Sequence, residues 1–412
     1  MADTKRIDWI DRLRGIAFFF VVLGHVYTPE PVNAYIYSFH MPLFFFISGL
    51  TLNADKLIKT PMKQIFMNNL KRLIIPYLWL NFMMFPLWVL TYKIIATAKS
   101  SVPRVFFGIF YGNGNNFSTP SNALWFLLTL FFANILIAVV LKIFKTDFTK
   151  IGFTVAIFAL IGYFDRDTDY IWHLNTVFTA IAFIFLGYAF MQYYRANEDK
   201  IRTLCKKKYV GIVAILILCG VVASILNGRM SINSNHFGKS LWLFYLGAIV
   251  GTLAVTLIVL RLPKIALFDF IGKNTMLYLA IHAPIIRLFE KLCPLALEKA
   301  YISVPFAIVL YFAIMPLCLL FNKIFPFAVG KTTTAEKSKF LKISGAIMIS
   351  ECLAVPFFYL IYKLCPTLLN GITLLIPVAI WIVLTAIITL LFYKVFKIFF
   401  LIEEKPVAKV KL

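Results

Sequence analysis

The sequence contains long apolar runs without charged residues, and such runs recur along nearly its whole length. A run of roughly 20 apolar residues can cross a bilayer as a helix, and shorter runs can cross where the bilayer thins. Of the 412 residues, 61% are hydrophobic and 14% are charged, whereas a soluble domain is about half apolar and about a quarter charged. These runs exclude a soluble enzyme and predict an all-α, polytopic bundle of transmembrane helices.

Twelve runs are predicted to be membrane spans. Their approximate boundaries are 13–29, 35–52, 73–92, 121–141, 151–164, 174–194, 209–226, 241–260, 274–292, 303–322, 343–363 and 372–393. The first ten are expected to form a core within residues 1–325. The last two are expected to add a transmembrane hairpin within 326–402, followed by a tail at 403–412.

Basic residues gather on alternate predicted loops. If the N-terminus is cytoplasmic, the inner segments hold 31 of the 41 Lys and Arg residues. Positive residues concentrate on the cytoplasmic side of membrane proteins, so we expect both termini in the cytoplasm and the protein in the plasma or inner membrane. The same bias accounts for most of the net charge of +23, and nucleic acid is therefore not an expected partner.

The first predicted span carries ionisable side chains on one face. Arg14 and His25 are eleven residues apart, which in an α-helix is about 1100°, or roughly 20° from the same face and about 16 Å along the axis. Asp11 lies one turn before Arg14. Ionisable residues within a span mark functional sites, and the apolar Val21 and Val22 favour a neutral His25, the form that a general base needs. We expect Asp11, Arg14 and His25 to be catalytic, the alternative being a histidine that only packs.

The next two spans carry polar residues close to their predicted ends. His40 is expected near the outer face, with Pro42 in the first turn of its helix, where proline is tolerated. Lys71 and Arg72 lie at the inner start of the third span, where they suit the phosphates of a nucleotide-like cofactor. The structural alternatives are an interfacial histidine and two cations that only fix the orientation of the span.

A fourth polar segment opens the ninth span. Thr275, Tyr278 and His282 are spaced by three and four residues and therefore share one helix face. His282 lies about 12 Å beyond Asn274 along the axis, at a depth comparable with that of His25. Two histidines at similar depth predict a common polar cavity, and a stripe of structural hydrogen bonds is the alternative.

The predicted outer loops 97–120, 165–173 and 227–240 combine Asn, Ser, Asp and aromatic residues. Such side chains suit hydroxyl-rich ligands such as sugars, although solvated connectors have a similar composition. The sequence contains no HExxH, P-loop or GxSxG motif, and none of its six cysteines forms a CxxC pair. A metal site is therefore not expected.

Several segments together resemble the acyltransferase-3 family of integral membrane proteins, in particular its branch of fucose 4-O-acetylase-like sugar O-acetyltransferases. The resemblance rests on "RLRGIAFFFVVLGH" with its Arg14-to-His25 spacing, "FHMPLFFFISG", "LKRLIIPY", "NALWFL" at 122–127, "NHFG" at 235–238 and "NTMLYLAIH" at 274–282. The segments cover residues 6 to about 290.

This resemblance implies an enzyme of about ten spans that moves an acyl group, usually acetyl, from cytoplasmic acyl-CoA to a hydroxyl of a cell-surface or exported carbohydrate. It maps His25 to the catalytic histidine, and Arg14 and Arg72 to cationic positions near the CoA or the acyl group. Many relatives carry a second basic residue where this chain has Asn69, and Lys71 is the candidate replacement. The C-terminal hairpin has no counterpart in the ten-span core.

The resulting hypothesis places acetyl-CoA on Arg14, Lys71 and Arg72, with a carbohydrate and the lipid bilayer as partners. His25 then either deprotonates the acceptor hydroxyl or carries the acyl group itself. The residues expected to bind the sugar are His40, Trp125, Asn235, His236, Asn274, Tyr278 and His282.

A second interpretation of twelve spans is a secondary transporter that exports a saccharide or a lipid-linked saccharide. Transporters usually contain repeated halves. Residues 1–200 and 201–412 share no repeated motif, which favours the enzyme.

Overall fold

A computed structural model describes most of the predicted core. The described residues are 7–89, 100–114, 116–330, Val383 and Ile387. Regular structure within them is helical apart from one antiparallel bridge between Ser231 and His236. The prediction of an all-α fold is confirmed for this part of the chain, whereas the spans predicted at 343–363 and 372–393 lie almost wholly outside it.

Each of the ten spans predicted up to residue 322 coincides with a helix. The helices are α1 (Asp8–His25), α2 (Glu30–Leu50), α5 (Ile75–Trp88), α7 (Trp125–Phe144), α8 (Phe148–Phe164), α9 (Leu174–Ala196), α11 (Lys206–Asn227), α12 (Leu241–Arg261), α14 (Thr275–Leu292) and α15 (Ala300–Ile324). Shorter helices between them are α3 (Ala54–Lys59), α4 (Met62–Asn69), α6 (Val102–Tyr111), α10 (Glu198–Thr203) and α13 (Ala266–Lys273). In the described ranges, five helices are long and apolar enough to cross a membrane, namely those containing α7, α9, α11, α12 and α15. The count of twelve spans stays a prediction.

The second helix begins earlier than the sequence indicated. Helix α2 starts at Glu30, so Pro42 lies in its interior and not in its first turn. Pro31 occupies the first turn instead, because its fixed backbone angle suits a position that has no helical hydrogen bond to lose. His40 therefore projects from the middle of a long helix and not from its end.

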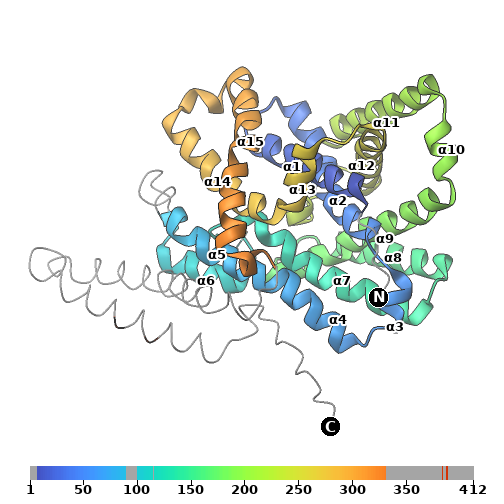
Figure 1. The fold of residues 1–412 in the computed structure, drawn as a ribbon, viewed down its shortest axis with the longest axis horizontal. Coiled ribbons are helices and arrows are strands. Elements are labelled where there is room, and N and C mark those ends of the chain that lie inside the picture. Colours follow the sequence, from blue (N-terminus) through green and yellow to red (C-terminus); the bar gives the residue numbers. More distant parts are fainter. Residues whose placement is uncertain (1–6, 90–99, 115, 331–382, 384–386, 388–412) are drawn as a thin grey trace, which may run out of the picture.

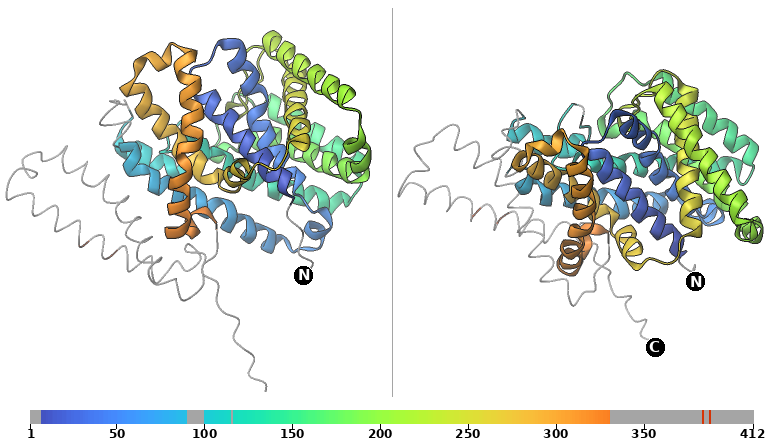
Figure 2. Two further views of the ribbon diagram at one scale, coloured as in Figure 1. Left: turned by 45° about the horizontal axis from the view of Figure 1, so that its top comes forward. Right: turned by 90° about the horizontal axis from the view of Figure 1, so that it is seen from above.

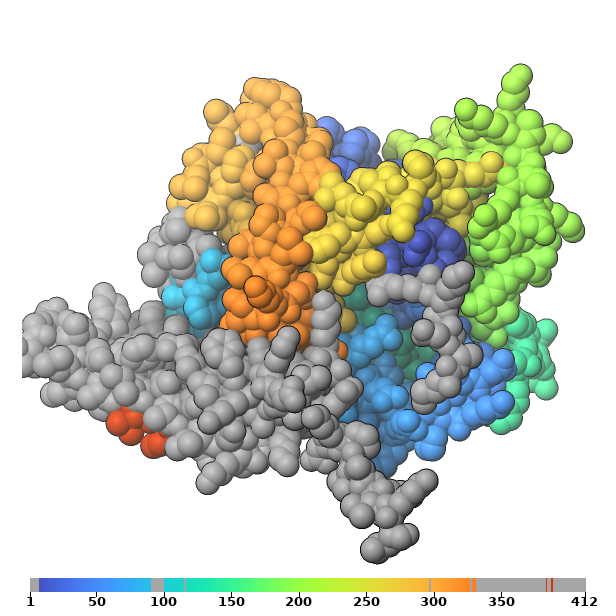
Figure 3. All heavy atoms as spheres, viewed as in Figure 1, coloured from blue at the N-terminus to red at the C-terminus, as the bar shows by residue number. Residues whose placement is uncertain are grey.

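The N-terminal helix lies in the interior of the fold. Helix α1 packs against α2 and also against α12, α13, α14 and α15, which are more than 200 residues away in the sequence (Figures 1 and 2). Helix α2 packs in turn against α9, α11 and α12. In the space-filling view, α13 and α15 cover much of α1 on one face (Figure 3). The helix predicted to carry the reactive groups is therefore surrounded by other helices.

The contact between α1 and α13 is close enough to require glycine on both sides. A Cβ atom on Gly15 would overlap the carbonyl oxygen of Phe268, and a Cβ atom on Gly272 would overlap the carbonyl oxygen of Asp11. Small residues let helix backbones approach closely, which strengthens packing between membrane helices. These two glycines fix the distance between the start of α1 and α13.

An ion pair fixes the same contact. Arg12 Nε lies 3.4 Å from Asp269 Oδ1, and less than a tenth of either side chain is exposed. Arg12 Nη1 also donates a hydrogen bond of 2.8 Å to the carbonyl oxygen of Leu262. Loss of either charge would leave the other buried without compensation, so the pair holds α1 in register with α13.

The glycine contact predicts a stability difference between two Gly→Ala variants. Gly15→Ala is expected to lower the free energy of unfolding by about 1–3 kcal/mol, because the new methyl group forces two backbones apart. Gly211→Ala in α11 is the matched control, since a Cβ atom there meets nothing within 4 Å and alanine favours a helix by about 1 kcal/mol. Thermal unfolding in detergent measures both, and equal melting temperatures would contradict the contact.

Candidate active site

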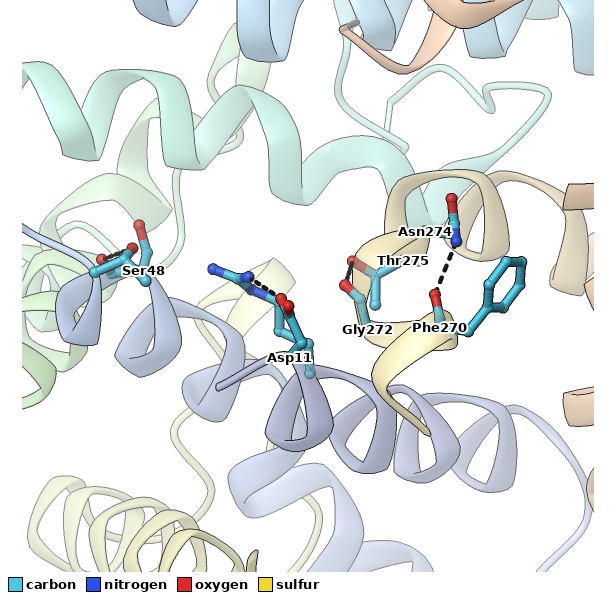
Figure 4. A network of polar contacts seen from close by, with 8 residues as sticks. Asp11, Ser48, Phe270, Gly272, Asn274 and Thr275 are labelled. Carbon is cyan, nitrogen blue, oxygen red and sulfur yellow. Dashed lines mark hydrogen bonds and ion pairs between the residues drawn. The ribbon is translucent and has the colours of Figure 1, made fainter. Parts of the chain in front are cut away.

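Arg14 and Asp11 form the ion pair that their spacing predicts. Arg14 Nη1 donates to Asp11 Oδ1 at 3.0 Å, and Asp11 is buried while 24% of the Arg14 side chain is exposed. Figure 4 shows Asp11 between Ser48 of α2 and Thr275 at the start of α14. Because the carboxylate restrains the guanidinium, Arg14 is held at the point where α1 meets the junction of α13 and α14.

Arg14 lines a cavity of about 200 Å³ that we call the arginine cavity. Arg72 and Lys273 supply two further cations, and the described residues of the lining include no Asp or Glu. The other polar side chains in its wall are those of Ser48, Asn274 and Thr275. Three cations around one cavity create a binding site for an anion such as a phosphate group.

Arg72 also lines a neighbouring cavity of about 290 Å³, the asparagine cavity. Ser48 belongs to both linings, so the two cavities adjoin. Asn69 Oδ1 accepts a hydrogen bond of 3.1 Å from Asn134 Nδ2 in this wall. Lys71, which the sequence grouped with Arg72, is exposed and lines neither cavity.

A third cavity, of about 230 Å³, contains the predicted catalytic histidine and is called the histidine cavity. Its lining includes His25, His40, Trp125 and the side chain of Leu279. Leu279 lines the arginine cavity as well. The arginine cavity and the histidine cavity are therefore neighbours that share Leu279 in their walls.

His25 is the last residue of α1, and its side chain is exposed. Besides the histidine cavity, it borders a smaller cavity of about 150 Å³ next to Arg287 and Glu290. The sequence placed the ring among the apolar side chains of Val21 and Val22. Val21 does line the histidine cavity together with His25, and both valines are buried. The difference is that α1 ends at His25, which is itself exposed.

Two further histidines have a defined hydrogen-bonding pattern near His25. The Nδ1 atom of His40 donates to the carbonyl oxygen of Ile36 at 2.8 Å, and that of His282 donates to the carbonyl oxygen of Tyr278 at 2.9 Å. A carbonyl only accepts, so in both neutral rings Nε2 presents a lone pair. The His282 ring centroid lies 5.2 Å from that of His25, and its buried Nε2 has no hydrogen-bond partner among the described residues. His282 is thus a buried acceptor directly beside His25.

The remaining residues predicted to bind sugar are distributed over different places. Trp125 lines the histidine cavity, whereas Asn274 lines the arginine cavity and so lies on the other side of Leu279. Tyr278 is fully buried in the core. Asn235 is buried and accepts a hydrogen bond from a threonine of α9, and His236 is exposed; neither lines any of the four cavities described above.

The structure adds cavity residues that the sequence did not single out. They are Tyr37, Asn122 and Arg229 in the histidine cavity and Ser48 and Lys273 in the arginine cavity. Arg229 carried a signal, since it is a basic residue in a loop predicted to be outside. Within the described ranges, no group of three or more His, Cys, Asp or Glu residues is arranged to hold a metal ion.

Comparisons with known proteins identify the family. The sequence profile of the acyltransferase-3 family, described as an acyltransferase domain, matches residues 7–323. This range contains every α-helix that lines the cavities described above. No curated protein and no solved structure matches the chain. The chain therefore belongs to the acyltransferase-3 family, and it is a membrane-embedded acyltransferase.

Proposed function

We propose that this protein transfers an acyl group, typically acetyl, from cytoplasmic acyl-CoA to a hydroxyl group of a cell-surface or exported carbohydrate. The observation that supports this proposal most is the position of Leu279, which lines both the arginine cavity and the histidine cavity. A donor bound by its phosphates on one side of Leu279 has its thioester within reach of a base on the other. The family match favours acyl transfer over the transport alternative.

The arginine and asparagine cavities together form the proposed donor site. Coenzyme A carries a pyrophosphate and a phosphate monoester, which suit guanidinium groups and lysine ammonium groups. Arg72 borders both cavities, while Arg14 and Lys273 lie on the side nearer Leu279. Arg14, Arg72 and Lys273 all lie in segments predicted to be cytoplasmic, where positive residues concentrate. Acetyl-CoA is the expected donor, as in the sugar O-acetyltransferase branch that the sequence resembles.

The proposed chemistry uses His25 as a general base. Its ring removes the proton from the acceptor hydroxyl, and the resulting oxygen nucleophile attacks the thioester carbonyl. A carbon–oxygen bond forms, the carbon–sulfur bond breaks, and the leaving thiolate takes up the proton from His25. His282 positions the ring, because its buried Nε2 can accept a hydrogen bond from a protonated nitrogen of His25.

The histidine cavity is the proposed acceptor site. Trp125 offers an aromatic face on which a sugar ring can stack, and Asn122 offers an amide for its hydroxyl groups. His40 presents the lone pair of Nε2 to a hydroxyl group, since its Nδ1 is engaged with the backbone. The acceptor class is that of the fucose 4-O-acetylase-like branch.

Removal of the proposed base tests the function directly. His25→Ala is expected to lower transfer of label from radiolabelled acetyl-CoA by at least about 100-fold, because a general base contributes about 10²- to 10⁴-fold to a rate. Immunoblots of membranes control for protein level. Activity within tenfold of the wild type would exclude His25 as the base. Label bound to the protein itself, in the absence of acceptor, would show instead that His25 carries the acyl group.

The adjacent cations Lys71 and Arg72 test the donor site. Arg72→Gln is expected to raise the KM for acyl-CoA about 10- to 100-fold, since a hydrogen bond to a charged group contributes about 1.5–3 kcal/mol. Lys71→Gln is expected to change KM at most about fivefold, because Lys71 lines neither donor cavity and a solvent-screened charge contributes about 1 kcal/mol or less.

Lys63→Gln in α4 is the control, because Lys63 is exposed and lines none of the described cavities. Steady-state kinetics on membranes with varied acyl-CoA measures the three variants. A larger effect of Lys71→Gln than of Arg72→Gln would contradict the assignment of the donor site.

A further inference from the structure

The histidine cavity contains a cation that the transfer chemistry does not use. Arg229 lines this cavity together with His25 and His40. Neither Asp nor Glu occurs among the lining residues that the structure describes. A neutral sugar needs hydrogen-bonding groups and an aromatic face, and it does not need a full positive charge beside the base.

Among the described residues Arg229 has no hydrogen-bond or ion-pair partner, unlike three arginines of the predicted outer loops and the outer end of the ninth predicted span. Arg104 donates to the carbonyl oxygen of Asn116 at 2.8 Å, while Arg166 and Arg287 pair with acidic residues at 3.8 Å and 3.2 Å. The contact that Arg229 makes among the described residues is a cation–π contact with Tyr37, whose ring centroid lies 5.2 Å from the guanidinium carbon. No hydrogen bond from Arg229 to another described residue accompanies this contact, so the N–H groups of its guanidinium are available to a ligand.

The backbone that carries Arg229 is fixed on both sides. Asn227 Nδ2 donates to the carbonyl oxygen of Phe237 at 2.8 Å, and Asn227 Oδ1 accepts from the backbone N–H of Ser240 at 2.7 Å. Met230, the next residue along, is fully buried. Gly228 has a φ of +74°, a conformation that other residues rarely adopt. The loop that carries Arg229 is therefore anchored, and Arg229 itself lines the histidine cavity.

We propose that the acceptor is anionic and that Arg229 binds its carboxylate or phosphate group while His25 acts on a neighbouring hydroxyl. This inference rests on the proposed function and narrows its substrate class from carbohydrates in general to acidic ones. The guanidinium edge matches two oxygen atoms of a carboxylate or phosphate, which fixes the orientation of the sugar as well as its affinity. Arg229 is thus assigned as the residue that determines acceptor specificity.

The experiment uses membranes containing the full-length chain, radiolabelled acetyl-CoA and surface glycans from a strain that lacks the gene. The glycans are supplied in three forms: untreated, carboxyl-reduced with carbodiimide and borohydride, and freed of phosphate with hydrofluoric acid. We expect one of the two treatments to lower transfer by the wild type about 10- to 100-fold, as loss of a charged hydrogen-bonded group does. The treatment that does so identifies the anion.

Variants at Arg229 then separate anion binding from a general effect. Arg229→Gln is expected to raise the KM for untreated glycans by a similar factor with little change in kcat, and to leave the KM for the sensitive treated form unchanged. Arg229→Lys should recover part of the affinity. Arg166→Gln removes a charge from the same predicted side, away from the described cavities, and should behave as the wild type does.

The outcomes distinguish this inference from the function on which it rests. Equal transfer by the wild type to all three forms would overturn the anionic acceptor and leave acyl transfer intact. An equal loss of kcat in Arg229→Gln on treated and untreated glycans would also overturn it, because the effect of Arg229 would then not depend on binding the carboxylate or phosphate group. Absence of transfer by the wild type to every form would refute the proposed function and this inference with it.

Discussion

The contact between α1 and α13 determines the geometry of the whole candidate site. Gly15 and Gly272 allow the two backbones to touch, and the buried pair of Arg12 and Asp269 fixes their register. Helix α1 then carries Arg14 at one end and His25 at the other. Helix α13 leads directly into α14, which supplies Leu279 between the two cavities and His282 beside His25. A single helix crossing therefore places Leu279 and His282 of α14 against the helix that carries both Arg14 and His25.

The features that the sequence predicted correctly are those that a single helix determines. The apolar runs placed ten helices, and the eleven-residue spacing placed Arg14 and His25 on one helix, because helical rise and twist are local properties. The comparable depth of His25 and His282 predicted a common polar cavity; their ring centroids lie 5.2 Å apart, but His282 is not among the residues that line the four described cavities. The shared cavity therefore stays a prediction.

Properties that depend on packing between helices were not accessible from the sequence. Lys71 and Arg72 are adjacent and chemically similar, yet only Arg72 lines the cavities. Both are exposed and lie in a π-helical turn, Leu70–Ile74, which changes the rotation of the chain before α5 and so affects which cation reaches the cavities. Asn274 was assigned to the sugar but lines the arginine cavity, because the position of the dividing wall at Leu279 is a tertiary property. Tyr37 and Arg229 lie on separate segments and form one wall only in the fold.

The different linings of the two cavities suit different parts of the proposed reaction. An activated thioester in open water is lost to hydrolysis, and enclosure of a reaction prevents such side reactions. The buried side chain of Leu279 separates the cationic cavity from the cavity at His25, so in the proposed reaction only the narrow acyl end of the donor has to pass it. In that reaction the phosphates would stay with Arg14 and Arg72, which balance their charge. The acceptor would lie on the other side of Leu279, where Arg229 is the cation among the described lining residues. On this proposal, one leucine allows a charged donor and a charged acceptor to meet at a single histidine without sharing a binding site.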